Sequence, residues 1–221
     1  MVYDVCFNQG GSVAVAKKEQ TEKQRQDEER IERETREIII RIKDGDENAY
    51  AKLVKLYHNQ VASLAFKMVG DYDEAADIAQ DVFVKTSQNI WRYDETKKFY
   101  TWLYRITINA SIDYKRKHKR HYHESIEKVN TKADDKFATP ELSYQRGQIR
   151  QYIDEATAGL NDKQRSAFVL RDVDGFNIND VADTMDMPVA TVRWYLHRAR
   201  AKVKKDLLRK CPHLLLALGF K

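Results

Sequence analysis

Apolar residues recur every three or four positions in several stretches of the chain, and short polar breaks separate these stretches. The turn Asp44-Gly45-Asp46 precedes the first clear stretch, with Asp46 as the expected N-cap, and Gly70 follows it. Such spacing places the apolar side chains on one face of a helix. The pattern therefore predicts an amphipathic helix over residues 49–69. Its expected buried positions are Leu53, Leu56 or Tyr57, Val61, Leu64 or Ala65, and Met68.

A second helix is predicted from Asp73, and the positions expected to face inward are Ala75, Ile78 or Ala79, Val82 and Ile90. Its opposite face is largely acidic. An acidic face is usually only solvated, but it also suits docking on a basic surface, where electrostatics set the rate and register of association. The residues of this outer face are Asp77, Gln80, Asp81 and Val84.

The stretch 99–120 predicts a third helix of the same group. Phe99, Trp102, Leu103 and Ile106 fall on one face, which is expected to be buried. The helix runs into a cluster of five basic residues between positions 115 and 120. An aromatic surface that leads into a cationic end suits nucleic acid, because bases stack on aromatic rings while phosphates meet the basic groups. A buried helix with a solvated basic tail explains the same pattern. The residues expected outside are Tyr100, Tyr104, Arg105, Ile108, Ser111 and Lys115.

Two short helices joined by a tight turn are predicted near the C-terminus. Asn161 is the expected cap of a helix over 162–172, and Gly175 ends that segment. Asn177 begins a short helix over 178–185, and a turn at 186–188 leads into a long helix over 189–210. This is the helix-turn-helix pattern.

The long helix is strongly basic. Residues 190–210 hold eight Lys or Arg and a single acid, Asp206. In a helix-turn-helix motif the start of the second helix enters the major groove, and the flanking basic groups hold phosphates. An ordinary helical hairpin with a solvated cationic face is the alternative. The buried positions are expected to be Val192, Leu196, Ala199 and Val203, and the DNA-binding candidates are Thr191, Arg193, Trp194, Tyr195, Arg198, Arg200 and Lys202.

These elements predict an all-α protein with two small helical domains joined by a flexible linker. The expected parts are a charged N-terminal extension (1–40), a four-helix domain (41–118), a linker (119–139), a helix-turn-helix domain (140–211) and a tail (212–221). The second domain is expected to open with a helix that starts at Thr139-Pro140-Glu141 and runs to about Ala158. Residues 1–16 are expected to be disordered, and 17–37, with seven basic and eight acidic residues, to be a solvated helix or disordered.

The amino-acid composition also favours an all-α protein, and the net charge and the cysteines bear on its partners and its compartment. One third of the 221 residues are charged, with only eight glycines and three prolines, which favours helix over a sandwich or barrel. The net charge of +5 allows an anionic partner. No apolar run is long enough to span a bilayer, and the start lacks a signal-peptide pattern. Cys6 and Cys211 form no CxxC motif, so we expect a cytoplasmic chain with reduced thiols, no metal site and no cofactor.

Several motifs resemble the extracytoplasmic-function (ECF) group of sigma-70-type sigma factors. DEAADIAQDVFVK is similar to region 2 of that family through Asp77, Gln80, Asp81, Val82 and Phe83, and FYTWLYRITIN through Trp102, Leu103, Arg105, Ile106 and Asn109. The segment from LNDKQRSAFVL to VRWYLHRARAKV resembles region 4. About 150 residues share the family's order and spacing.

The resemblance implies a promoter-specificity subunit, not an enzyme. It implies that Asp77, Gln80, Asp81 and Phe83 bind the β′ clamp helices of core RNA polymerase and that region 4 meets the β flap. It implies that the 92–98 loop and the helix through Asn109 and Asp113 open the −10 element, with Lys115 and Arg116 on the DNA backbone. The helix after Pro188 would read the −35 element. An anti-sigma factor is a further implied partner, without direct membrane insertion of this chain.

Three departures from the family pattern bear on these roles. Ala76 stands where Glu is common, Ala190 replaces the usual Gly, and Trp194-Tyr195 replaces a common Ser-Arg pair. An Arg on the helix that reads the DNA contributes about 1–3 kcal/mol of discrimination for the base it contacts. Because this chain lacks that Arg, we predict an unusual −35 sequence.

The competing class of protein is an autonomous helix-turn-helix regulator whose first domain senses a ligand or a partner. An enzyme is the third class, and the sequence argues against it because it has no metal-ligand spacing, phosphate-binding loop or nucleophile–base pattern.

Overall fold

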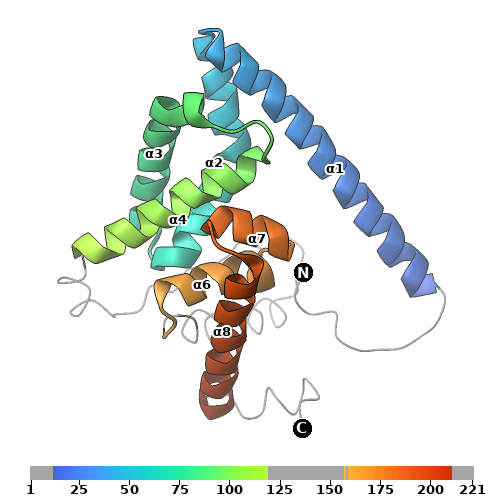
Figure 1. Cartoon of the computed structure of the whole chain (residues 1–221), viewed down its shortest axis with the longest axis vertical. Coiled ribbons are helices and arrows are strands. Elements are labelled where there is room, and N and C mark those ends of the chain that lie inside the picture. The colour runs from blue at the N-terminus through green and yellow to red at the C-terminus, as the bar shows by residue number, and fades with distance from the viewer. Residues whose placement is uncertain (1–11, 119–156, 158, 211–221) are drawn as a thin grey trace, which may run out of the picture.

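The computed structural model describes residues 12–118, 157 and 159–210. Every regular element within these residues is helical, which confirms the predicted all-α class (Figure 1). The linker 119–139, the segment 140–156 and the tail 212–221 lie outside the described residues. The elements are α1 (Ser12–Lys43), α2 (Glu47–Val69), α3 (Tyr72–Asn89), η1 (Ile90–Arg92), α4 (Phe99–His118), α6 (Asp162–Phe168), η2 (Val169–Val173), α7 (Ile178–Met185) and α8 (Val189–Lys210).

The first four helices form an N-terminal unit whose boundaries follow from capping residues. Asp46 caps α2 as predicted, because its carboxylate accepts a hydrogen bond from the Ala49 amide at 3.2 Å. Gly70 ends α2 in the left-handed conformation, at φ 91°. Asp71 caps α3 by accepting from the Glu74 amide at 3.0 Å. The two aspartates therefore fix where α2 and α3 begin, and Gly70 fixes where α2 ends.

Helix α1 is longer than the sequence predicts. It begins at Ser12, so the expected disorder is wrong for residues 12–16. Its C-terminal end packs on α2 through buried Ile38 and Ile39, and the Thr35 hydroxyl lies 2.9 Å from the Tyr57 hydroxyl. Burial raises the pKa of Tyr57 to about 12, although the hydrogen bond with Thr35 opposes that shift. The rest of α1 extends away from the bundle (Figure 1).

The remaining described residues form a C-terminal unit of α6, η2, α7 and α8. Asn161 caps α6 in a capping box with Gln164, and η2 continues it as a π-helical turn that ends before Gly175. Asn177 caps α7, and Asp186 takes the left-handed conformation, at φ 53°, in the turn that leads to α8. The four residues predicted to be buried on α8 are buried. The helix-turn-helix prediction is therefore confirmed.

The two units pack against each other along α4 and α7. The Phe176 ring lies between two tyrosines of α4, with centroid distances of 5.3 Å to Tyr100 and 5.5 Å to Tyr104. The prediction that Tyr104, Ile108 and Ser111 are exposed is wrong, since all three are buried, and for Tyr104 this contact is part of the reason. The buried face of α4 is wider than its apolar stripe because α2 and α3 cover one side and α7 covers another.

Candidate nucleic-acid interface

The exposed start of α8 presents an indole and a guanidinium that lie together. Trp194 is 51% exposed, as the sequence predicts, and the Arg198 guanidinium carbon lies 4.5 Å from the centroid of its indole ring. A cation over an aromatic face is attracted to the ring quadrupole. The indole therefore restrains Arg198 on the surface that would meet a DNA groove.

Tyr195 points differently from its neighbour. It is half-buried against the core, and the Lys163 ammonium of α6 lies 5.9 Å from its ring centroid. Its ring also meets the edge of Trp194 at 5.0 Å. The structure thus places Tyr195 between α8 and α6, and leaves Trp194 and Arg198 as the more exposed pair.

Two other predicted DNA-binding residues are engaged within the C-terminal unit. The Arg200 guanidinium donates to both carboxylate oxygens of Asp172, at 2.8 and 2.6 Å, and this hydrogen bonding raises the Arg200 pKa. The Lys202 ammonium donates to the Gly159 carbonyl. Thr191 is half-buried at the start of α8. Arg200 and Lys202 therefore hold α8, the expected recognition helix of the motif, against the rest of the C-terminal unit.

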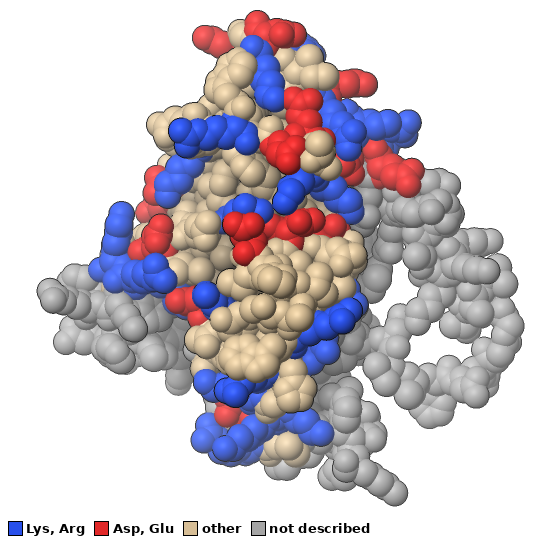
Figure 2. Space-filling view, viewed as in Figure 1, with Lys and Arg blue, Asp and Glu red and all other residues tan. Residues whose placement is uncertain are grey.

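A basic groove runs beside the exposed face of α8. It has a volume of about 540 Å³ and is lined by Arg171, Arg193, His197, Arg200 and Lys204. Figure 2 shows Lys and Arg gathered around the end of the molecule that α8 forms. Sequence reasoning found Arg193 but not Arg171, which lies in η2 and joins the groove only through the fold. The groove can hold the phosphates of a duplex.

The acidic face of α3 is open to solvent, with one exception among the predicted residues. Asp77, Gln80 and Asp81 are exposed, but Phe83 is only 7% exposed and its ring stacks on His58. Phe83 therefore belongs to the core of the N-terminal unit in this conformation, which corrects its placement on the docking face. Val84, 55% exposed and four positions after Gln80 on α3, adds an apolar side chain to this face.

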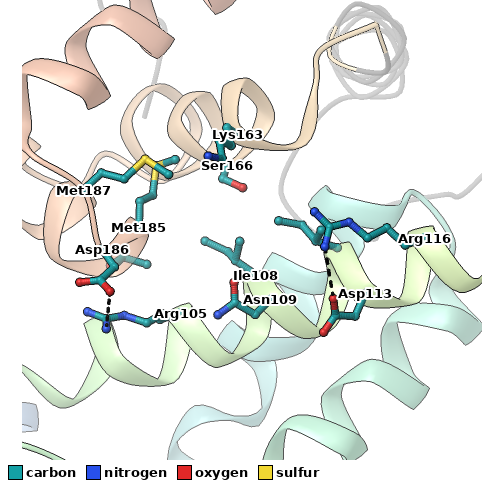
Figure 3. Close-up of a pocket in the computed structure, with 12 residues that line it drawn as sticks. Arg105, Ile108, Asn109, Asp113, Arg116, Lys163, Ser166, Met185, Asp186 and Met187 are labelled. Atoms are coloured by element: carbon teal, nitrogen blue, oxygen red, sulfur yellow. Dashed lines mark ion pairs between the residues drawn. The ribbon is translucent and has the colours of Figure 1, made fainter.

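Three of the four α4 residues predicted to contact the −10 element line a cleft between the two units (Figure 3). The cleft has a volume of about 470 Å³, and Asn109, Asp113 and Arg116 of α4 face Lys163 of α6 and Met185 of α7 across it. Arg116 pairs with Asp113 at 3.8 Å on the same helix. The structure thus brings the α4 candidates together with each other and with the C-terminal unit.

Lys115 and Arg105 join α4 to the C-terminal unit by direct polar contacts. The Lys115 ammonium lies 3.4 Å from the Asp162 carboxylate. The Arg105 guanidinium donates to the Asp183 carbonyl at 2.6 Å and lies 3.5 Å from the Asp186 carboxylate. Arg105 was predicted to be exposed and is instead half-buried at this junction. Among the described residues there is no group of three metal-ligating side chains, and no helix there has the length and apolarity to cross a membrane.

Comparison with known proteins identifies both units. Sigma-70 region 2 matches residues 53–121, and Sigma-70 region 4 matches residues 150–203. The chain is 32% identical over 176 residues to the ECF RNA polymerase sigma factor SigW of Bacillus subtilis, covering 76% of this chain and 94% of SigW.

Solved structures show the same fold. CnrH, in complex with the cytosolic domain of CnrY, superposes with a TM-score of 0.59 at 21% identity, covering 80% of this chain and 99% of that chain. The sigma factor RpoE of Bartonella quintana, in complex with the anti-sigma factor NepR, gives a TM-score of 0.56 at 20% identity, covering 72% and 96%. The exposed recognition helix, the acidic face of α3 and these matches lead to one conclusion: the chain belongs to the ECF sigma factors, which direct RNA polymerase to promoters.

Proposed function

We propose that the acidic face of α3 docks this sigma factor on the β′ clamp helices of core RNA polymerase, through Asp77, Gln80 and Asp81. The observation that carries this proposal is the exposure of all three residues on one face of a helix that otherwise faces the core. The carboxylates of Asp77 and Asp81 carry no ion pair within the described part of the chain, so their charge is available to a basic partner. The exposed side chain of Val84, one turn after Gln80 on α3, extends the same surface with apolar area.

The C-terminal unit binds the −35 duplex through α8 in this proposal. Trp194 and Arg198 face base edges, while Arg193 and the basic groove beside it hold backbone phosphates. The C-terminal unit also meets the β flap of the polymerase. In the N-terminal unit, Asn109, Asp113, Lys115 and Arg116 hold the opened −10 element, and an extruded base stacks on nearby aromatic groups.

The remaining partners follow from this role. The chain works in the cytoplasm, where core polymerase and promoter DNA are, and phosphodiester chemistry stays with the polymerase. An anti-sigma factor is proposed as the inhibitor, supported by the two structural neighbours, one of which is a sigma factor bound to an anti-sigma factor.

A reconstituted transcription assay tests the proposal. The chain is mixed with core polymerase and DNA of the source genome, and the RNA 5′ ends are sequenced. We expect discrete start sites with shared upstream elements, lost in the Asp77→Ala/Asp81→Ala variant and kept in the matched control Asp44→Ala/Glu47→Ala, which removes two exposed acids elsewhere. Specific duplex binding by the isolated chain, without initiation, would instead identify an autonomous regulator.

A further inference from the structure

The junction between the two units has a one-sided distribution of charge. Five ion pairs join the units within the described residues, and in each the base belongs to the N-terminal unit and the acid to the C-terminal unit. Two further contacts add to them, since the Tyr100 hydroxyl donates to Asp180 and Arg105 donates to the Asp183 carbonyl. The pairs are Lys67–Asp174, Lys97–Asp183 (3.4 Å), Lys98–Asp180 (3.1 Å), Arg105–Asp186 (3.5 Å) and Lys115–Asp162 (3.4 Å).

Three of these acids form one edge of the helix-turn-helix domain. Asp180 and Asp183 are three residues apart on α7, and Asp186 follows in the turn, so the three carboxylates follow one another along the side of α7 that meets α4. We call this row the acidic edge of α7. In Figure 2, red and blue side chains meet in a band across the middle of the molecule, where α4 and α7 lie in Figure 1.

The bases that meet the acidic edge either belong to the 92–98 loop expected to open the −10 element or lie beside the α4 residues proposed to hold it. Lys97 and Lys98 end the loop before α4, and Arg105 lies one turn before Asn109 on α4. Asn109 and Asp113 themselves face the C-terminal unit across the cleft. A carboxylate and a phosphate both accept hydrogen bonds from Lys and Arg, so the same cations serve either anion.

We propose that the acidic edge of α7 takes the place of DNA phosphates on α4, so that the free chain is closed and its −10 surface is masked by its own helix-turn-helix domain. This inference rests on the proposed role of α4. The packing of Phe176 against Tyr100 and Tyr104 stabilises the closed state, and the ion pairs determine how α7 is aligned on α4. Single-stranded DNA and the acidic edge then compete for the same cations. The faces of α3 and α8 stay exposed, so closure leaves both docking helices accessible.

The test replaces acids of the edge without touching the proposed DNA contacts. Asp183→Lys places a base opposite Lys97, and Asp186→Asn removes the partner of Arg105 while keeping a residue that tolerates φ 53°. The matched control, Asp73→Lys/Asp44→Asn, makes the same change in net charge at two exposed acids away from the junction. Thermal unfolding confirms that each variant is folded.

Amide hydrogen exchange of the free chain measures the closed state without any DNA present. Amides of α4 around Tyr104 and Ile108 should exchange faster in Asp183→Lys/Asp186→Asn than in the wild type or the control. Adding Lys97→Glu to Asp183→Lys restores an ion pair of reversed polarity and should slow exchange again. Unchanged exchange in the edge variant would overturn the closed state.

The affinity of the chain for single-stranded DNA measures whether the −10 surface is masked. The probe is a fluorescein-labelled pool of random 15-nucleotide single-stranded DNA, followed by anisotropy. If nine in ten chains are closed, opening strengthens apparent affinity by about tenfold. We expect a gain of that order in the edge variant and a much smaller gain in the control. Equal gains in both variants would overturn masking, because net charge alone would explain them. The start-site assay above reports separately on whether the chain is a functional sigma factor.

Discussion

At the scale of single residues, the pairing of Trp194 with Arg198 has consequences for DNA reading. An Arg held in position by an aromatic ring loses less conformational freedom when it binds a guanine. The half-buried Tyr195, which replaces a common Arg of the family, is directed toward Lys163 and contributes less exposed surface. Promoter preference should therefore depend more on position 194 than on position 195.

We expect Trp194→Ala to weaken binding of a promoter duplex by about five- to tenfold, since the contact is worth on the order of 1 kcal/mol. The measurement is a mobility shift of the holoenzyme on a promoter recovered from the start-site assay. Tyr195→Phe is the control and should bind as the wild type does. A larger loss in Tyr195→Phe than in Trp194→Ala would show that the tyrosine hydroxyl reads the DNA.

The predicted unusual −35 sequence is tested at the neighbouring position. Tyr195→Arg restores the common residue of the family, and selection from random duplex DNA with the holoenzyme compares its preference with that of the wild type. We expect a changed base preference at one position of the −35 element, because a guanidinium adds a bidentate contact worth about 1–3 kcal/mol. An unchanged preference would count against the prediction.

At the scale of elements, capping residues made most helix boundaries predictable. Asp46, Asn161 and Asn177 each accept backbone hydrogen bonds at the start of the helix that the sequence assigned to them. These signals are local, so they can be found without knowing the fold. The same reasoning missed the length of α1, since its N-terminal half offers charged residues in place of an apolar stripe.

A cap variant measures how much one such signal contributes. The Asn177 side chain accepts from the amides of Asn179 and Asp180, at 3.0 and 2.9 Å. Asn177→Ala should therefore lower the free energy of unfolding by about 1 kcal/mol, measured by urea denaturation. Asn179→Ala, at an exposed position whose side chain has no cap role, should change it by less than half as much.

Helix α4 shows where sequence reasoning fails. Its apolar stripe at Phe99 and Leu103 predicts one buried face correctly, because α2 and α3 are neighbours in the chain and in space. Tyr104 packs against Phe176, and Ile108 lines the cleft with the C-terminal unit, so a unit that begins some forty residues later contributes to their burial. Amphipathic periodicity reports that a helix has a core side, but it carries no information about a second partner. The cleft and the five ion pairs were unpredictable for the same reason.

At the scale of the whole molecule, Arg165 joins the two units through backbone contacts. It is buried in α6, and its guanidinium donates to the Met68 carbonyl at 2.8 Å and to the Thr157 carbonyl at 3.2 Å. A buried cation needs such partners, because an unpaired one is strongly destabilising. The Lys67–Asp174 ion pair links the same end of α2 to the C-terminal unit.

Arg165→Met should lower the free energy of unfolding by about 1–3 kcal/mol, because it removes these hydrogen bonds and leaves the carbonyls unsatisfied. Calorimetry should show a fall in Tm of about 2–4 °C for each kcal/mol lost. Lys163→Gln, at an exposed position of the same helix, is the control. An unchanged Tm in Arg165→Met would mean that water replaces the guanidinium without cost.

The position of α7 between two other helices limits how its sequence can vary. Of its eight residues, only Asn179 is exposed, because α4 covers one side and α8 the other. A substitution that improves the fit to one neighbour must also suit the other. A complete mutational scan should therefore find α7 less tolerant than α8, although α8 is the helix proposed to touch DNA. Over evolutionary time the supporting helix would diverge more slowly than the recognition helix, and promoter preference would change without disturbing the junction beneath it.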